Sequence, residues 1–331
     1  MSETTIAWYR TRLDPAALKE LTRRSDARGL AQGLAHLAVV AGTAFFTWWS
    51  VGRLAWPLVI AAFFVHGTVL SFLGGAGAMH ELSHGTPFKT RWLNEVFLAI
   101  ASFLSWSNPA LFRASHARHH LYTVHHGLDL EVVLPGRFRL RDFLWQLAFN
   151  PVGVYHQLRG HMRLALGILE GEWENRILTG ENARLKAGVV AWARVQVIGH
   201  VALGVVFGVL GQWILIPILL TPFYAGWLAI SCAIPQHLGM KPDVADWRLV
   251  ARTVIINPVL RFLYWNMAWH VEHHMYAAVP FHALGRLHRL IAADTPKPNR
   301  GLVAAWREIA AWQRRQAGDP SYVVDPWTRK G

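Results

Sequence analysis

The sequence predicts an all-α integral membrane protein with four transmembrane helices, further helices at the membrane interface, and a cytoplasmic helical cap. Three observations support this fold class. Hydrophobic residues make up 53% of the 331 residues. Several uncharged runs reach about 20 residues, the length that crosses a bilayer. Seventeen tryptophans are present, and tryptophan gathers at membrane interfaces. An ordinary soluble enzyme is not expected from this composition.

The predicted spans form two pairs. From Val195 to Met240 the chain carries no charged residue at all, and a turn near "LGQ" divides this stretch into two helices. A soluble protein would have to bury two such hairpins, and the remaining residues are too few to surround them. The four predicted spans are residues 30–50, 54–79, 187–209 and 212–234. Two further apolar stretches, residues 92–107 and 253–269, are short or interrupted and are predicted to lie in the interface.

The basic residues fix the predicted orientation. Residues 1–29, 80–186 and 235–331 hold 6, 12 and 13 of the 33 lysines and arginines. An even number of spans places all three segments on one side, and the positive-inside rule makes that side cytoplasmic. The net charge of +13 is thereby explained by topology, so no nucleic-acid partner is predicted.

Three regions follow from this layout. They are a cytoplasmic segment (residues 1–29), a four-span domain with its cap (residues 30–290), and a basic cytoplasmic C-terminal segment (residues 291–331). Both termini and the candidate site are expected on the cytoplasmic side. The expected location is the inner membrane of a bacterium.

Three histidine clusters lie in the predicted cytoplasmic segments: "HELSH" (residues 80–84), "HARHH" (116–120) and "HVEHH" (270–274). Spacings of three and four residues place imidazoles on one helical face. Eight imidazoles exceed the four ligands that zinc usually takes, and suit two metals of higher coordination number. His237, in "PQHLG", is a candidate ninth ligand. The eight are His80, His84, His116, His119, His120, His270, His273 and His274.

The other histidines are expected to be ordinary surface or hydrogen-bonded residues. This group contains His36, His66, His161, His200, His282 and His288, and His125 and His126 are expected in a loop.

The three clusters resemble the histidine boxes of the membrane fatty acid desaturase and hydroxylase superfamily. The stretch "EHHMYAAVPFHAL" also looks like the one that follows the last box in acyl-lipid desaturases. The resemblance covers about residues 60–290. It implies a non-haem centre of two iron ions with O₂ as co-substrate, and it strengthens His237 as a ligand. Ala233 stands where some relatives have an asparagine that holds a water on one iron.

The resemblance implies an oxidoreductase that inserts a double bond into a fatty acyl or lipid chain. A hydroxylase or demethylating monooxygenase acting on a smaller amphipathic molecule is the alternative within the superfamily. A membrane zinc hydrolase is a more distant alternative, disfavoured by the surplus of imidazoles. A metal transporter is disfavoured because its ligands would lie near the membrane midplane.

Imidazole ligands generally need their other ring nitrogen held by a carboxylate or carbonyl. Candidates within or near the boxes are Glu81, Asp129, Glu131 and Glu272. The alternative is that these acids pair with arginines such as Arg113 and Arg118. Three aromatic residues near the last box are candidate walls of a substrate tunnel, with interfacial anchoring as the alternative: Trp265, Trp269 and Tyr276.

The electrons for the reaction are expected from outside the chain. Its single cysteine, Cys232, excludes an iron–sulfur centre of its own, and no dinucleotide fingerprint is present. A ferredoxin-, rubredoxin- or cytochrome-type donor with its reductase is therefore predicted. The basic face would attract an acidic donor and equally anionic membrane lipids.

Overall fold

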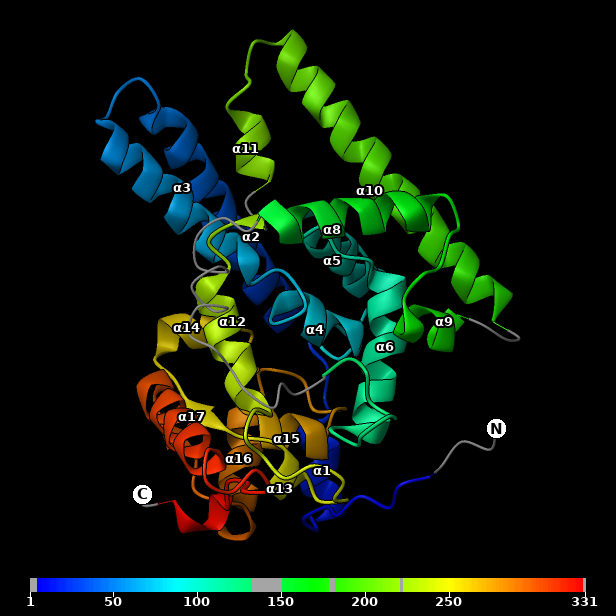
Figure 1. Cartoon of the computed structure of the whole chain (residues 1–331), viewed down its shortest axis with the longest axis vertical. Helices are drawn as coiled ribbons and strands as arrows, with labels where there is room; N and C mark the ends of the chain where they lie inside the picture. The colour runs from blue at the N-terminus through cyan, green and yellow to red at the C-terminus, as the bar shows by residue number, and fades with distance from the viewer. Residues whose placement is uncertain (1–4, 133–150, 179–181, 221–222, 330–331) are drawn as a thin grey trace.

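The computed structural model describes residues 5–132, 151–178, 182–220 and 223–329, and these residues are mainly helical (Figure 1). Within them, the strands are two-residue segments, β1 (Val254–Ile255) and β2 (Asn299–Arg300), which pair in parallel. The helical fold class is confirmed, and this small sheet is the part that the sequence did not predict.

Two helices are long and apolar enough to cross a membrane, namely α2 (Asp26–Ser50) and α10 (Ala183–Val209). They correspond to the first and third predicted spans. Helix α2 begins where the side chain of Ser25 accepts a hydrogen bond from the backbone of Arg28, which satisfies one of the unpaired N–H groups of the first turn.

The second and fourth predicted spans are shorter than expected. Helix α3 (Trp56–Ser71) ends eight residues early, because the chain turns tightly before α4 (Ala78–Ser83). A Cβ at Gly77 would overlap the carbonyl oxygen of Phe72, so this turn needs a glycine. The fourth span is divided into α11 (Leu215–Leu219) and α12 (Trp227–Ala233). Four uninterrupted membrane helices are therefore not observed in the described residues.

The first predicted interfacial stretch forms α5 (Arg91–Leu104), followed by α6 (Pro109–Tyr122) after a bend of 103°. The second, residues 253–269, is not one helix. It contains β1 and the short α14 (Pro258–Leu263), whose start is set by Pro258 at its first position and by the capping side chain of Asn257.

The cap gathers helices from both ends of the chain (Figure 1). It contains α1 (Pro15–Leu21), α13 (Trp247–Val250), α15 (His270–Met275), α16 (Leu284–Ile291) and α17 (Leu302–Gln316). Their shared core contains buried Trp247, Tyr264, Met275 and Leu284. The hairpin of α2 and α3 and the pair α10 and α11 extend away from this cap in the same direction. Helices α8 (Pro151–Ala165) and α9 (Glu172–Leu178) pack beside α10 and α6.

Candidate metal centre

The three histidine boxes lie on three helical segments, of which the third belongs to the cap. The first box follows the glycine turn on α4, the second occupies the last two turns of α6, and the third forms most of α15. Helix α6 starts at Pro109, and the side chain of Asn108 caps it by accepting a hydrogen bond from the backbone of Leu111. His237 comes from a fourth segment, directly after the 3₁₀ helix Ile234–Gln236.

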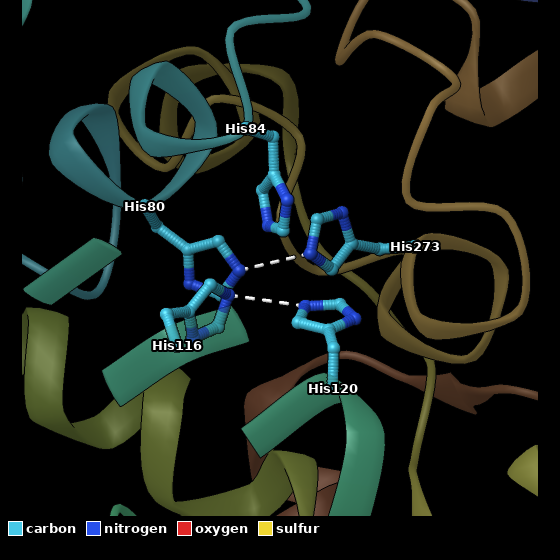
Figure 2. Close-up of side chains that lie close together, drawn as sticks. All are labelled: His80, His84, His116, His120 and His273. Atoms are coloured by element: carbon cyan, nitrogen blue, oxygen red, sulfur yellow. Dashed lines mark hydrogen bonds between the residues drawn. The ribbon is translucent and has the colours of Figure 1, made fainter. Parts of the chain in front are cut away.

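Five imidazoles form a first nitrogen group (Figure 2). Each offers one ring nitrogen, and these five atoms all lie within 4.8 Å of one another. The Nε2 atoms of His80 and His273 are 2.9 Å apart although 193 positions separate them in the chain. The Nε2 atoms of His116 and His120 are 3.1 Å apart. The group consists of His80, His84, His116, His120 and His273.

A second nitrogen group lies beside the first. His119, His237 and His274 each offer a ring nitrogen, again within 4.8 Å of one another. His270 adjoins them, since its Nε2 lies 2.9 Å from that of His237 and 3.0 Å from that of His274. The rings of His120 and His274 stack at 4.3 Å between centroids, so the two groups are in contact.

The boxes are divided between the groups. The expectation that all three imidazoles of one box point to one place is wrong in detail. Residues four apart stay together, as His116 and His120 do in the first group. The remaining ring of the box, His119, joins the other group, because adjacent positions on a helix differ by about 100° in direction. The third box divides in the same way, with His273 in the first group and His274 in the second.

Burial keeps most of these rings neutral. Burial, with a smaller contribution from the charge of nearby His119, lowers the pKa of His84 to about 4 and the pKa of His237 to about 3. Burial similarly holds the pKa of His273 well below its ordinary value. A neutral imidazole has a free lone pair and is the form that binds metals. The centre is therefore prepared to bind a cation at neutral pH.

Two carboxylates hold imidazoles of the second box. The Nδ1 atom of His119 lies 2.8 Å from Asp129 Oδ2, and that of His116 lies 2.7 Å from Glu131 Oε1. Although burial opposes it, the hydrogen bond to Asp129 raises the pKa of His119. Asp129 is itself fixed by accepting a hydrogen bond from the backbone of Val124 at 2.9 Å. These contacts leave the Nε2 atoms of both rings to face the centre.

The two other candidate acids contact different partners. Glu81 accepts hydrogen bonds from Thr86 and from the backbone of Phe281, and burial raises its pKa to about 7. Glu272 lies 2.5 Å from the ring of His288, a residue expected from the sequence to be an ordinary surface or hydrogen-bonded histidine. The alternative pairing of the box acids with Arg113 is not observed, because Arg113 pairs with Glu95 on α5 at 2.7 Å.

Several buried ring nitrogens in the centre have no hydrogen-bond partner among the described residues. They are His84 Nε2, His270 Nδ1 and His273 Nδ1. A buried polar atom without a partner costs free energy, and close contacts between pairs of imidazoles cannot satisfy every nitrogen. A cation in the first nitrogen group would supply a partner to His84 Nε2. His270 and His273 contact their groups through Nε2, so their Nδ1 atoms would remain without one. An all-nitrogen donor set suits iron, copper or zinc.

The three aromatic candidates are engaged in packing. Trp265 donates a hydrogen bond to His36 of α2 at 3.0 Å, and Trp269 packs on the ring of His288 at 4.5 Å. The hydroxyl of Tyr276 donates to the carbonyl of Thr11. These contacts explain the positions of the three aromatic side chains without a role in binding substrate.

A mainly apolar cavity of about 600 Å³ lies beside the centre, between α6, α8 and α9. Its lining includes Met79, which precedes the first box, and Glu131, which holds His116. Phe112 also lines it and stacks on the ring of His116 at 5.2 Å. No sequence pattern predicted this cavity, because its walls come from segments far apart in the chain.

Comparison with known protein families matches residues 54–306 to the family described as fatty acid desaturase. The matched region covers more than half of the chain and contains the eight histidines of the two nitrogen groups and the adjoining His270. A search of curated proteins found no match.

Proposed function

This chain belongs to the fatty acid desaturase family, and from this premise we propose that it uses two iron ions and O₂ to insert a double bond into a fatty acyl or lipid chain. The observation that carries the proposal is the pair of nitrogen groups, nine imidazoles in contact and mostly kept neutral by burial. A single zinc site would need about three of them.

The first nitrogen group would hold one metal ion and the second group, with His270, the other. Bound iron would supply, together with O₂, the oxidising power needed to break an aliphatic C–H bond, which no side chain can provide. The remaining work falls to the protein. Asp129 and Glu131 fix the orientation of two rings through their Nδ1 atoms, and such partners also raise the basicity of the ligand.

The cavity beside α6 supports a lipid substrate. Its volume of about 600 Å³ lies in the range of small-molecule sites, and its apolar walls suit an alkyl chain. Phe112 lines this cavity, and its ring centroid lies 5.2 Å from that of His116 and 6.4 Å from that of His80. We assign Phe112 the task of positioning the chain beside the first nitrogen group.

The proposed setting is a membrane, with α2 and α10 crossing it fully. Helix α3 and the divided segment of α11 and α12 would complete four crossings, and the cap would face the cytoplasm. The basic segments that surround the cap support this orientation. A separate electron donor of ferredoxin, rubredoxin or cytochrome type, with its reductase, would dock on this basic face.

A turnover assay tests the proposal. The purified protein in lipid vesicles would be given O₂, a reduced donor and acyl lipids, and the products would be analysed by mass spectrometry. We expect a product two mass units lighter than the substrate, formed by wild type and by His126→Ala, and absent for His120→Ala. His126 is an exposed residue paired with Asp243, outside both nitrogen groups.

The mass of the product distinguishes the alternatives. A gain of sixteen mass units, with the oxygen derived from O₂, would assign the protein as a hydroxylase instead. Turnover that does not need O₂ would contradict the proposal altogether.

A further inference from the structure

A basic pocket of about 700 Å³ lies in the cap where the chain enters α2, and the proposed redox chemistry makes no use of it. Its walls come from the segment before α2, from the end of α14 and from α16. Six arginines line it against a single acid, Glu20. They are Arg23, Arg24, Arg28, Arg261, Arg286 and Arg289.

Most of this positive charge has no counter-ion. Arg286 pairs with Glu20 at 2.5 Å. Among the described residues, no carboxylate forms an ion pair with the other five arginines. Arg28 lies 3.1 Å from the ring of His282, a group that contributes no negative charge. Guanidinium groups gathered in one concave site repel one another, and an anion in the site would remove that repulsion.

Two buried donors of the pocket are also unsatisfied. Neither Arg261 Nε nor His282 Nε2 has a hydrogen-bond partner in the described part of the chain. Both residues line the pocket. A bound anion with several acceptor oxygens would supply partners to these nitrogens as well as to the exposed guanidinium groups.

The pocket lies next to α2, one of the two helices proposed to cross the membrane. Arg28 is in the first turn of α2, and Leu34, six residues further along this helix, is a large exposed apolar side chain. At a rise of 1.5 Å per residue the two are separated by about 9 Å along the axis. The side chain of Gln32 donates to the carbonyl of Phe262 at 2.7 Å, which ties the helix carrying Arg261 to α2. The arginines thus lie just beyond the apolar part of the span.

We propose that this pocket binds the phosphate of an anionic membrane lipid. Arginine binds phosphate through paired N–H groups, and a phosphate at this depth belongs to the headgroup layer. A concave site beside a membrane helix fits a headgroup, whereas a folded acidic protein needs a broad surface. The proposal concerns binding alone and does not depend on the identity of the metals.

Native mass spectrometry of the full-length, metal-containing protein tests this inference. Dioleoylphosphatidylglycerol would be titrated into the protein in detergent, beside dioleoylphosphatidylcholine and inorganic phosphate. The pocket variant is Arg23→Gln with Arg289→Gln. Both arginines are exposed, and neither forms an ion pair with another described residue. The matched control is Arg307→Gln with Arg314→Gln, exposed arginines of α17 that lie outside the pocket.

We expect wild type and the control variant to bind the anionic lipid in preference to phosphatidylcholine. The pocket variant should bind it about tenfold more weakly, because two charge-assisted contacts are lost. An equal loss in both variants would attribute the binding to diffuse surface charge and overturn the proposal. Equal binding of the two lipids would also overturn it. Displacement of the lipid by inorganic phosphate at similar concentration would reassign the pocket to a soluble phosphate.

Discussion

Two clusters of buried polar side chains can be compared, the centre built from nine imidazoles and a cluster in the cap built from Arg252, Glu308 and Arg329. Arg252 is fully buried, and its guanidinium donates to Glu308 at 2.7 Å and to the carbonyl of Leu238 at 3.0 Å. Arg329 donates to the same carboxylate at 2.7 Å. Asn299 adds a further donor at 3.1 Å. Every charge in this ionic cluster therefore has a partner within the chain.

The polar atoms of the imidazole centre are not all paired in this way. It has few acceptors and leaves ring nitrogens such as His84 Nε2 without a partner. The ionic cluster fixes α17 to the segment that follows His237, and its charges stabilise one another. Although burial opposes it, the hydrogen bond to Arg329 and the charge of Arg252 lower the pKa of Glu308 to about 2. A buried cluster whose polar atoms are all paired within the chain stabilises the fold. A buried cluster with unpaired polar atoms indicates that a ligand binds there.

Replacing an imidazole that has no partner should have the largest effect on function and little effect on folding. His84→Ala removes a ring of the first nitrogen group, so we expect metal binding to weaken and turnover to fall by at least about a hundredfold. Without metal, its free energy of unfolding should stay within about 1 kcal/mol of wild type, since no internal hydrogen bond of Nε2 is lost. A large loss of stability in the metal-free protein would contradict this assignment.

The ionic cluster should respond in the opposite way. Glu308→Gln leaves Arg252 buried without a counter-ion, and we expect the free energy of unfolding to fall by about 3 kcal/mol. Metal content of the folded protein should be unchanged. Denaturant titration followed by metal analysis checks both statements, with Glu172→Gln, an exposed helix-surface pair with Arg176, as the control. Loss of metal from folded Glu308→Gln would show that the two clusters are not separable.

Removing a carboxylate that orients a ligand should have an intermediate effect. Asp129→Asn keeps the size of the side chain but weakens its hold on His119 Nδ1. Metal affinity of the second nitrogen group should fall by about tenfold to a hundredfold. Competition with a chelator measures this, and Glu81→Gln, whose carboxylate holds no imidazole, should retain wild-type affinity.

The smallest effect is a difference in pH dependence. Burial lowers the pKa of His84 from 6.5 to about 4, so the unfolded chain takes up protons first as the pH falls. Stability due to this neutral ring is present above pH 6.5 and is lost as the pH falls toward 4. For Glu308, with a pKa lowered from 4.5 to about 2, the loss lies between pH 4.5 and 2. The free energy of unfolding of the metal-free protein should therefore fall in two steps as the pH is lowered. The first step, between pH 6.5 and 4, should remain in Glu308→Gln.

Helical periodicity predicts part of the candidate site. Spacings of four residues place His116 beside His120, and His270 beside His274, as the structure shows. Adjacent positions such as His119 and His120 must diverge on a helix, which the expectation of a single shared face overlooked. The contact of His80 with His273 depends on how the tertiary fold places α4 relative to α15, and nothing local in the sequence specifies it.

The prediction of the apolar helices from the sequence was limited in the same way. Hydropathy located α2 and α10 well, because their apolar runs are long and end at polar residues. It extended α3 too far, since residues 72–77 are apolar but form the tight turn that Gly77 permits. The ionic cluster was not predicted, because Arg252 and Glu308 are 56 positions apart and charged residues near a C-terminus usually lie on the surface.

The metal content of the purified protein tests the central claim most directly. Wild type and His126→Ala should contain about two iron ions per chain, a number that suits two groups of nitrogen ligands. His273→Ala, in the first nitrogen group, and His119→Ala, in the second, should each lose metal. One zinc ion per chain, or two metal ions retained in both of these variants, would contradict the account.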